Sequence, residues 1–188
     1  MPKTSQQNHL DPRQPLVVDT TKLPRQPGAT RALKRTIQAP KDLGLELINV
    51  PEKSDLELDL VLTSVSEGVY VSGHVRGSLS GECGRCLNEI SESVEVSLAE
   101  LFAYEDSTTE ETTDEDEVGR MQGDLIDLEP AVRDAIVLTL PTNPLCRPDC
   151  PGLCPECGVH FDDLPADHSH EEVDPRWAAL RNLTETEE

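Results

Sequence analysis

The sequence has few aromatic residues, few basic residues and no long apolar run. One Trp, two Tyr and two Phe occur among 188 residues, so the hydrophobic core is expected to be aliphatic. No segment approaches the roughly 20 apolar residues that a membrane helix needs. The first residues also lack the apolar stretch of a secretory signal. These absences predict a cytoplasmic protein without a membrane span.

Negative charge dominates the composition. The chain has 16 Lys and Arg against 37 Asp and Glu, a net charge of −21 at pH 7. Phosphate backbones and anionic lipid surfaces repel such a chain, so basic proteins are better candidate partners than free RNA or membranes. Residues 1–44 carry eight basic and three acidic side chains. A basic arm therefore precedes a strongly acidic body.

Apolar and polar residues alternate with a period of two between positions 45 and 104. This pattern predicts half-buried antiparallel strands over about 56–62, 69–79 and 94–98. Gly73 and Gly77 within the second run indicate bulges or a close approach of neighbouring backbone. The strands follow one another in sequence, which favours a meander or a partial barrel.

Shorter elements flank this region. The segments 15–20 and 125–126 are each expected to form one short strand. Asp127 is a suitable N-cap for a helix running from Leu128 toward Thr139. The predicted fold class is therefore α+β: an antiparallel β meander or partial barrel with a few short helices and a C-terminal zinc-binding Cys cluster.

Changes in composition divide the chain into three parts. Residues 1–14 are polar and aperiodic and are expected to be disordered. A β-rich domain is predicted over 15–145, with an acidic loop at 105–123. The last part, 146–188, is predicted to be a Cys-rich zinc module that ends in a short helix starting at Asp174.

A basic cluster lies within the arm, at Arg31, Lys34, Arg35 and Lys41. One interpretation is a contact with RNA phosphates, with a partner or with the chain's own acidic body. The alternative is a solvated surface stretch.

The six cysteines occur in closely spaced groups, which in a reducing compartment favours metal binding over disulfides. Cys83 and Cys86 form one C-x2-C pair, which alone is compatible with a zinc knuckle, a redox pair or two buried thiols. The denser group is Cys146, Cys150, Cys154 and Cys157. Four thiolates around Zn²⁺ leave no open position, so such a zinc ion would be structural.

Two assignments of the ligands remain open. The simpler one uses Cys146, Cys150, Cys154 and Cys157 as a single site and leaves Cys83 and Cys86 as a nearby thiol pair. The other joins Cys83 and Cys86 to Cys154 and Cys157. His160, His168 and His170 could each replace a thiolate, although histidines in such a polar segment are more often solvated.

Four stretches in this order resemble the YceD family, which is named for accumulation of large-subunit ribosomal RNA. The resemblance spans about 16–183 and implies a non-enzymatic factor that supports synthesis or processing of this RNA. The stretches are Gly81-Glu82-Cys83-Gly84-Arg85-Cys86-Leu87, Ile126 through Pro141, Cys146 through Gly158, and Asp174-Pro175-Arg176-Trp177-Ala178-Ala179-Leu180.

No motif of an enzyme is present, since the sequence lacks a phosphate-binding Gly-rich loop, G-x-S-x-G and H-E-x-x-H. We therefore expect no catalytic residues and no small-molecule substrate. The leading hypothesis is a factor in ribosome biogenesis that binds a basic large-subunit ribosomal protein, precursor rRNA or both. The alternatives are a zinc-stapled adaptor outside the ribosome and a direct RNA-binding protein.

Overall fold

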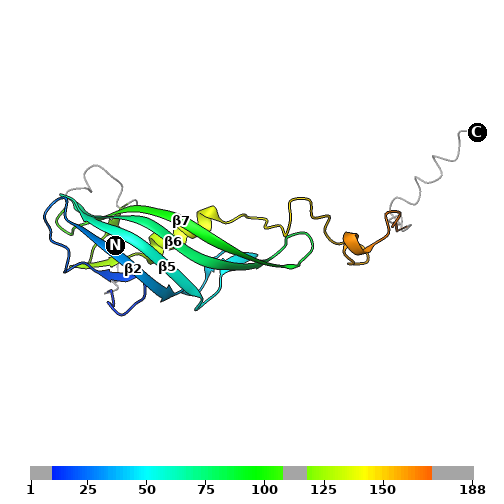
Figure 1. Cartoon of the computed structure of the whole chain (residues 1–188), viewed down its shortest axis with the longest axis horizontal. Helices are drawn as coiled ribbons and strands as arrows, with labels where there is room; N and C mark the ends of the chain where they lie inside the picture. The colour runs from blue at the N-terminus through cyan, green and yellow to red at the C-terminus, as the bar shows by residue number, and fades with distance from the viewer. Residues whose placement is uncertain (1–9, 108–117, 171–188) are drawn as a thin grey trace, which may run out of the picture.

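The computed structural model describes residues 10–107 and 118–170. Four long strands lie side by side and form most of the body, and a Cys-rich segment extends beyond one end of it (Figure 1). Neighbouring strands among the four are antiparallel. In spatial order they are β2 (Thr30–Gln38), β5 (Asp55–Ser64), β6 (Gly68–Glu82) and β7 (Glu89–Ala103).

The meander of β5, β6 and β7 follows the predicted alternation. Every second residue of β5 is buried, from Leu56 to Leu62, because successive side chains of a strand point to opposite faces. β6 and β7 pair in one constant register from Gly68↔Ala103 to Glu82↔Glu89. The predicted β meander is confirmed. The sheets are open, so no barrel closes within the described residues.

Gly73 and Gly77 of β6 both lie close to atoms of the neighbouring strand β5. Gly73 pairs with Leu60 and has φ 145°, and a Cβ there would lie 2.2 Å from the Asp59 carbonyl oxygen. A Cβ on Gly77 would lie 3.0 Å from Leu56 Cδ1. The predicted close approach is therefore confirmed, while the constant register between β5 and β6 shows that no bulge accompanies it.

Strand β2 is absent from the sequence-based prediction, which assigned this stretch only a basic cluster. Its buried apolar residues, Leu33 and Ile37, are four positions apart. Arg35 lies between them and Arg31 precedes them on the same face, and the two guanidinium groups donate to the carbonyl oxygens of residues 15 and 19. The strand forms because it completes a nine-residue ladder with β5.

Five short strands accompany the four long ones in the part of the chain that the structure describes. β1 (Val17–Asp19) and β9 (Leu125–Asp127), both predicted as separate strands, pair with each other to form a second, two-stranded sheet. The remaining short strands join the main sheet: β3 (Leu43–Gly44) pairs with β4 (Ile48–Val50), β4 pairs with β6, and β8 (Gly119–Arg120) runs parallel to the end of β7.

Helix α1 (Glu129–Thr139) begins one residue later than predicted. Leu128 occupies the N-cap position, and the Asp127 carboxylate accepts a 2.9 Å hydrogen bond from the Glu129 N–H. Val132 and Ile136 are buried against the core. No helix in the described part is long and apolar enough to cross a membrane.

Several predicted features lie wholly or partly outside the described residues. These are positions 1–9 of the predicted disordered tail, positions 108–117 of the acidic loop, and the helix predicted from Asp174. Within the predicted tail, Leu10 is placed by a hydrogen bond from its N–H to Gln122 Oε1.

The stability of the body should depend on the buried face of β5. We expect Leu60→Ala to lower the free energy of unfolding by about 2 to 5 kcal/mol, because it leaves a cavity in the core. The control is Val61→Ala, whose side chain points outward and is 40% exposed; it should cost no more than about 1 kcal/mol. Urea denaturation followed by circular dichroism measures both. Equal losses would contradict this assignment of the core face.

Candidate metal centres

The long β6–β7 hairpin carries two cysteines at its tip. β6 ends at Glu82 and β7 begins at Glu89, and the turn between them is closed by a 2.8 Å hydrogen bond from the Cys83 N–H to the Asn88 carbonyl. Cys83 and Cys86 are both buried. The hairpin therefore presents two thiols in a fixed turn at the end of the sheet.

The segment after α1 returns to this tip and supplies two more thiols. The Gly84 N–H donates to the Pro144 carbonyl at 2.8 Å, and Arg85 Nη1 donates to the Cys150 carbonyl at 2.8 Å. The Leu153 N–H donates to the Arg85 carbonyl at 3.1 Å. These bonds hold residues 144–153 across the turn.

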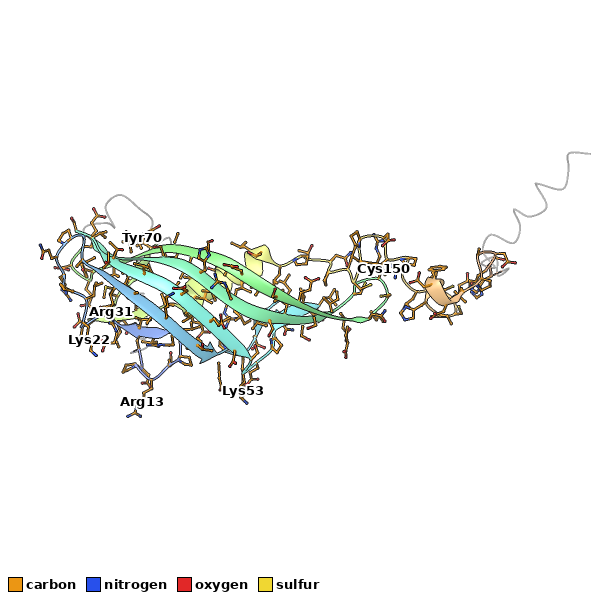
Figure 2. The ribbon with its side chains drawn as sticks, in the orientation of Figure 1. Arg13, Lys22, Arg31, Lys53, Tyr70 and Cys150 are labelled. Carbon is orange, nitrogen blue, oxygen red and sulfur yellow. The ribbon has the colours of Figure 1, made fainter. Side chains whose placement is uncertain are left out.

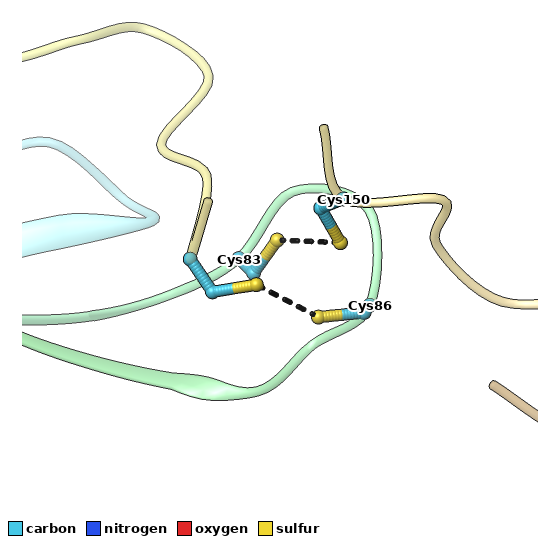
Figure 3. Close-up of side chains that lie close together, drawn as sticks. Cys83, Cys86 and Cys150 are labelled. Carbon is cyan, nitrogen blue, oxygen red and sulfur yellow. Dashed lines mark hydrogen bonds between the residues drawn. The ribbon is translucent and has the colours of Figure 1, made fainter. Parts of the chain in front are cut away.

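Four sulfurs converge as a result, from Cys83, Cys86, Cys146 and Cys150, which we call the hairpin cluster. Cys83 Sγ lies 3.8 Å from Cys150 Sγ, and Cys86 Sγ lies 3.6 Å from Cys146 Sγ (Figure 3). These separations are far longer than the ~2.05 Å of a disulfide, and all four cysteines are free thiols. The donor set could hold one metal ion.

The thiols of the hairpin cluster differ in acidity. Burial raises the pKa of Cys83, but N–H groups of Cys146, Arg85 and Cys86 outweigh burial and bring this pKa down to about 6. The bond to the Cys86 sulfur, together with burial, raises the pKa of Cys146 to about 12, and burial raises that of Cys150. One thiol ionises readily while its neighbours resist a second negative charge. A cation among the sulfurs would remove that repulsion.

A second group lies further along the chain, at Cys154, Cys157, His168 and His170, which we call the tail cluster. Cys154 Sγ lies 3.3 Å from His170 Nε2, and Cys157 Sγ lies 3.7 Å from His168 Nε2. The Gly158 N–H donates to the Cys154 carbonyl, with φ 70° at Gly158, so a tight turn brings the two thiols together. This set could also hold one metal ion.

Local contacts prepare the tail cluster for a cation. N–H groups of Cys157 and Glu156 are the main cause that lowers the pKa of Cys154 to about 6, against the effect of burial. The Glu156 carboxylate lies 3.3 Å from His170 Nδ1, which leaves His170 Nε2 directed at the cluster. A carboxylate partner of this kind is the usual way a metal-binding imidazole is oriented.

The cysteines are grouped differently from both sequence-based assignments. Cys146 and Cys150 lie with the hairpin thiols, whereas Cys154 and Cys157 lie with two histidines. The reason is the path of the chain at Gly152, which turns with φ 85° against the Arg85 backbone and leaves the hairpin before Cys154. That these six cysteines bind metal stays a prediction.

Sequence reasoning weighed His168 and His170 and left them as solvated residues. The signal that could have identified them is the unpaired Cys154-x2-Cys157 knuckle once Cys146 and Cys150 are used elsewhere. His-x-His then supplies the missing pair of ligands. His160, the third candidate, is in neither group and precedes the 3-10 helix η2 (Phe161–Asp163).

The predicted basic contacts lie in β2 and just after it, outside both clusters. Lys34 Nζ is 3.0 Å from Asp59 Oδ2, so it pairs with the neighbouring strand. Arg31 and Arg35 donate to carbonyl oxygens of the chain before β2, as described above. Lys41 follows β2, and its carbonyl accepts a bond from Arg133. Three of the four basic side chains thus bond within the protein's own body, and a contact of the cluster with RNA or a partner stays a prediction.

Loss of one ligand should loosen one cluster and spare the other. We expect Cys83→Ser to raise amide hydrogen exchange in residues 83–88 and 144–150, because the turn and the returning segment lose their common ion. Cys154→Ser should raise exchange only in 154–170. Hydrogen exchange with mass spectrometry measures both variants. If Cys154→Ser also released the hairpin tip, the separation into two clusters would be wrong.

Comparison with known proteins places the chain in a family. It is 53% identical over 166 residues to an uncharacterized protein of Mycobacterium tuberculosis strain H37Rv, covering 88% of this chain and 80% of that protein. An uncharacterized protein of Mycobacterium leprae is 44% identical over 169 residues, covering 90% of this chain and 77% of that protein. No solved structure matches. Because residues 71–184 match the family described as large ribosomal RNA subunit accumulation protein YceD, the chain belongs to the YceD family.

Proposed function

We propose that this protein is a non-enzymatic factor that supports synthesis, processing or accumulation of large-subunit ribosomal RNA, acting in the cytoplasm through a basic large-subunit ribosomal protein. The membership of the YceD family carries the proposal, because the family description names this RNA and no reaction. The net charge of −21 supports a basic partner, since opposite charges steer association.

The two clusters fit structural zinc. Zinc–sulfur bonds of about 2.3 Å in a tetrahedron hold sulfurs about 3.8 Å apart, and mixed sulfur and nitrogen ligands about 3.5 Å apart. The hairpin cluster has sulfur separations of 3.8 and 3.6 Å, and the tail cluster has sulfur–nitrogen separations of 3.3 and 3.7 Å. Each set has four ligands and no open position, so zinc would fasten the chain and would not catalyse a reaction.

The net negative charge favours a basic protein over RNA as the first partner, and the basic side chains that could contact RNA lie on one side of the body (Figure 2). In Figure 2, Arg13, Lys22, Arg31 and Lys53 lie along the lower side of the body, and Cys150 lies beyond its far end. Precursor rRNA is therefore best accommodated at this basic side, near β1 and β2. Stacking of bases on the sheet is disfavoured, because it needs several exposed aromatic rings. Tyr70 is exposed on the sheet, but Phe102 is buried and cannot contact a base.

The proposal is tested by depletion and capture in cells that make this protein. Depletion should lower the ratio of large-subunit to small-subunit rRNA and raise the precursor. Capture after mild crosslinking should recover a basic large-subunit protein, and recovery should fall at high salt because exposed charges are screened. An unchanged rRNA ratio would overturn the proposed function. Recovery of an unrelated protein alone would favour an adaptor outside the ribosome.

The same capture tests the basic side. Replacing Arg31, Lys34 and Arg35 by Glu should reduce recovery of precursor rRNA severalfold while the basic protein is still captured. The matched control exchanges the same residues conservatively, as Arg31→Lys, Lys34→Arg and Arg35→Lys, and keeps all three positive charges. Unchanged RNA recovery in the triple variant would show that this side does not contact RNA.

A further inference from the structure

Strand β7 has an open edge. It pairs with β6 along its whole length, but on its other side, among residues 10–107 and 118–170, only Phe102 and Ala103 pair, with β8. The Tyr104 N–H donates to the Glu67 carbonyl on the β6 side, and the Ala103 carbonyl accepts from Met121 on the other side. Backbone groups alternate along a strand. The N–H and C=O groups of Ser97 and Ala99 therefore point away from β6, as do those of Leu101, whose carbonyl is taken by the pairing of Phe102 with Gly119 of β8.

A groove runs beside this edge, between β7 and α1, with a volume of about 640 Å³. Leu98 and Phe102 of β7 line one wall, and Ala131, Ala135 and Leu138 of α1 line the other. Leu138 is 85% exposed, although it belongs to an otherwise well-packed helix. The groove thus offers apolar surface next to backbone groups of β7 that no described residue pairs.

Acidic side chains surround this apolar surface. Glu100 is two residues from both Leu98 and Phe102, so it lies on the same face of β7, yet it is exposed. Asp127 and Asp134 line the opposite side of the groove, and Arg120 is the basic residue of the lining. Within the described part of the chain, no ion pair forms to Glu100 or Asp134.

We propose that the groove between β7 and α1 binds an extended basic segment of a partner protein, which adds as a strand to the open edge of β7. Its backbone would bond to Ser97 and Ala99, and side chains two apart would enter the groove. There an apolar side chain meets Leu138, and a Lys or Arg meets Glu100 and Asp134. This inference rests on the proposed function and specifies how its basic partner is held.

An inward-facing acid on an edge strand is also a known protection against unwanted pairing between sheets. That role does not require an apolar groove, an exposed leucine on the facing helix or further acids across from it. Complementary charge decides the occupant: the net negative lining repels RNA phosphates and attracts lysine and arginine.

The test uses the full chain and a fluorescein-labelled peptide, Val-Thr-Lys-Thr-Val-Thr-Lys-Thr-Val, followed by fluorescence anisotropy. We expect binding that weakens about tenfold or more in Glu100→Lys combined with Asp134→Lys. The matched control, Glu46→Lys combined with Asp55→Lys, makes the same change in net charge at exposed positions away from the groove. Equal losses in both double variants would overturn the inference by showing nonspecific attraction.

Strand addition is tested separately. Ala99→Pro removes one outward N–H without touching the ladder to β6 and should weaken binding severalfold, whereas Ala99→Ser should not. Circular dichroism verifies the sheet in both variants. Unchanged binding by Ala99→Pro, equal binding of a peptide with Glu in place of Lys, or preference for an oligouridylate would each overturn the inference. A lowered rRNA ratio on depletion would still uphold the proposed function if the peptide fails to bind.

Discussion

The uninterrupted pairing of β6 with β7 is the constraint on which the other features depend. Each strand has fifteen residues, and the register does not change between Gly68 and Glu82. Bulges would twist or bend such a hairpin. Because the β6–β7 ladder has none, it continues past the last β5 pair, Leu56↔Gly77, and ends at the Cys83 turn. Within the described residues, the outer side of β7 pairs only at Phe102 and Ala103. The hairpin thus positions both the hairpin cluster and the groove.

Most ligands of the two candidate metal clusters lie in a segment that has little hydrophobic surface of its own. The segment after Pro141 is rich in Pro and Cys and poor in apolar residues, so it has little hydrophobic surface to bury. The main core ends with residues of α1, and Leu145 and Leu153 pack on a small separate cluster with Cys83, Cys86 and Cys150. Metal–ligand bonds are a suitable substitute for a core in such a segment. The sheet has its own aliphatic core and does not need them.

Much of the fold followed from local sequence patterns, and what did not was long-range. Alternation of apolar and polar residues predicted β5, β6 and β7, because each of these strands buries one face. β2 was missed because Arg31 and Arg35 occupy positions on its inner face, which breaks the alternation. Val18 pairs with Ile126, more than a hundred residues later in the sequence. Each segment was predicted to be a strand, but neither segment indicates its partner.

The candidate site shows the same limit. Spacing predicted the cysteines to be metal ligands but could not group them, because Cys146 meets Cys86 only through the return of the chain to the hairpin tip. The roles of His168 and His170 depended on that assignment. Family membership supplied the pathway, and the charge of the groove suggested the class of partner, which no motif encodes.

We propose that the six cysteines bind metal in two centres of different composition. The most direct measurement is X-ray absorption at the zinc edge on the purified protein, with zinc counted per chain. One zinc ion in each cluster predicts an average coordination of three sulfurs and one nitrogen. A single zinc ion per chain bound only by sulfur would contradict the account.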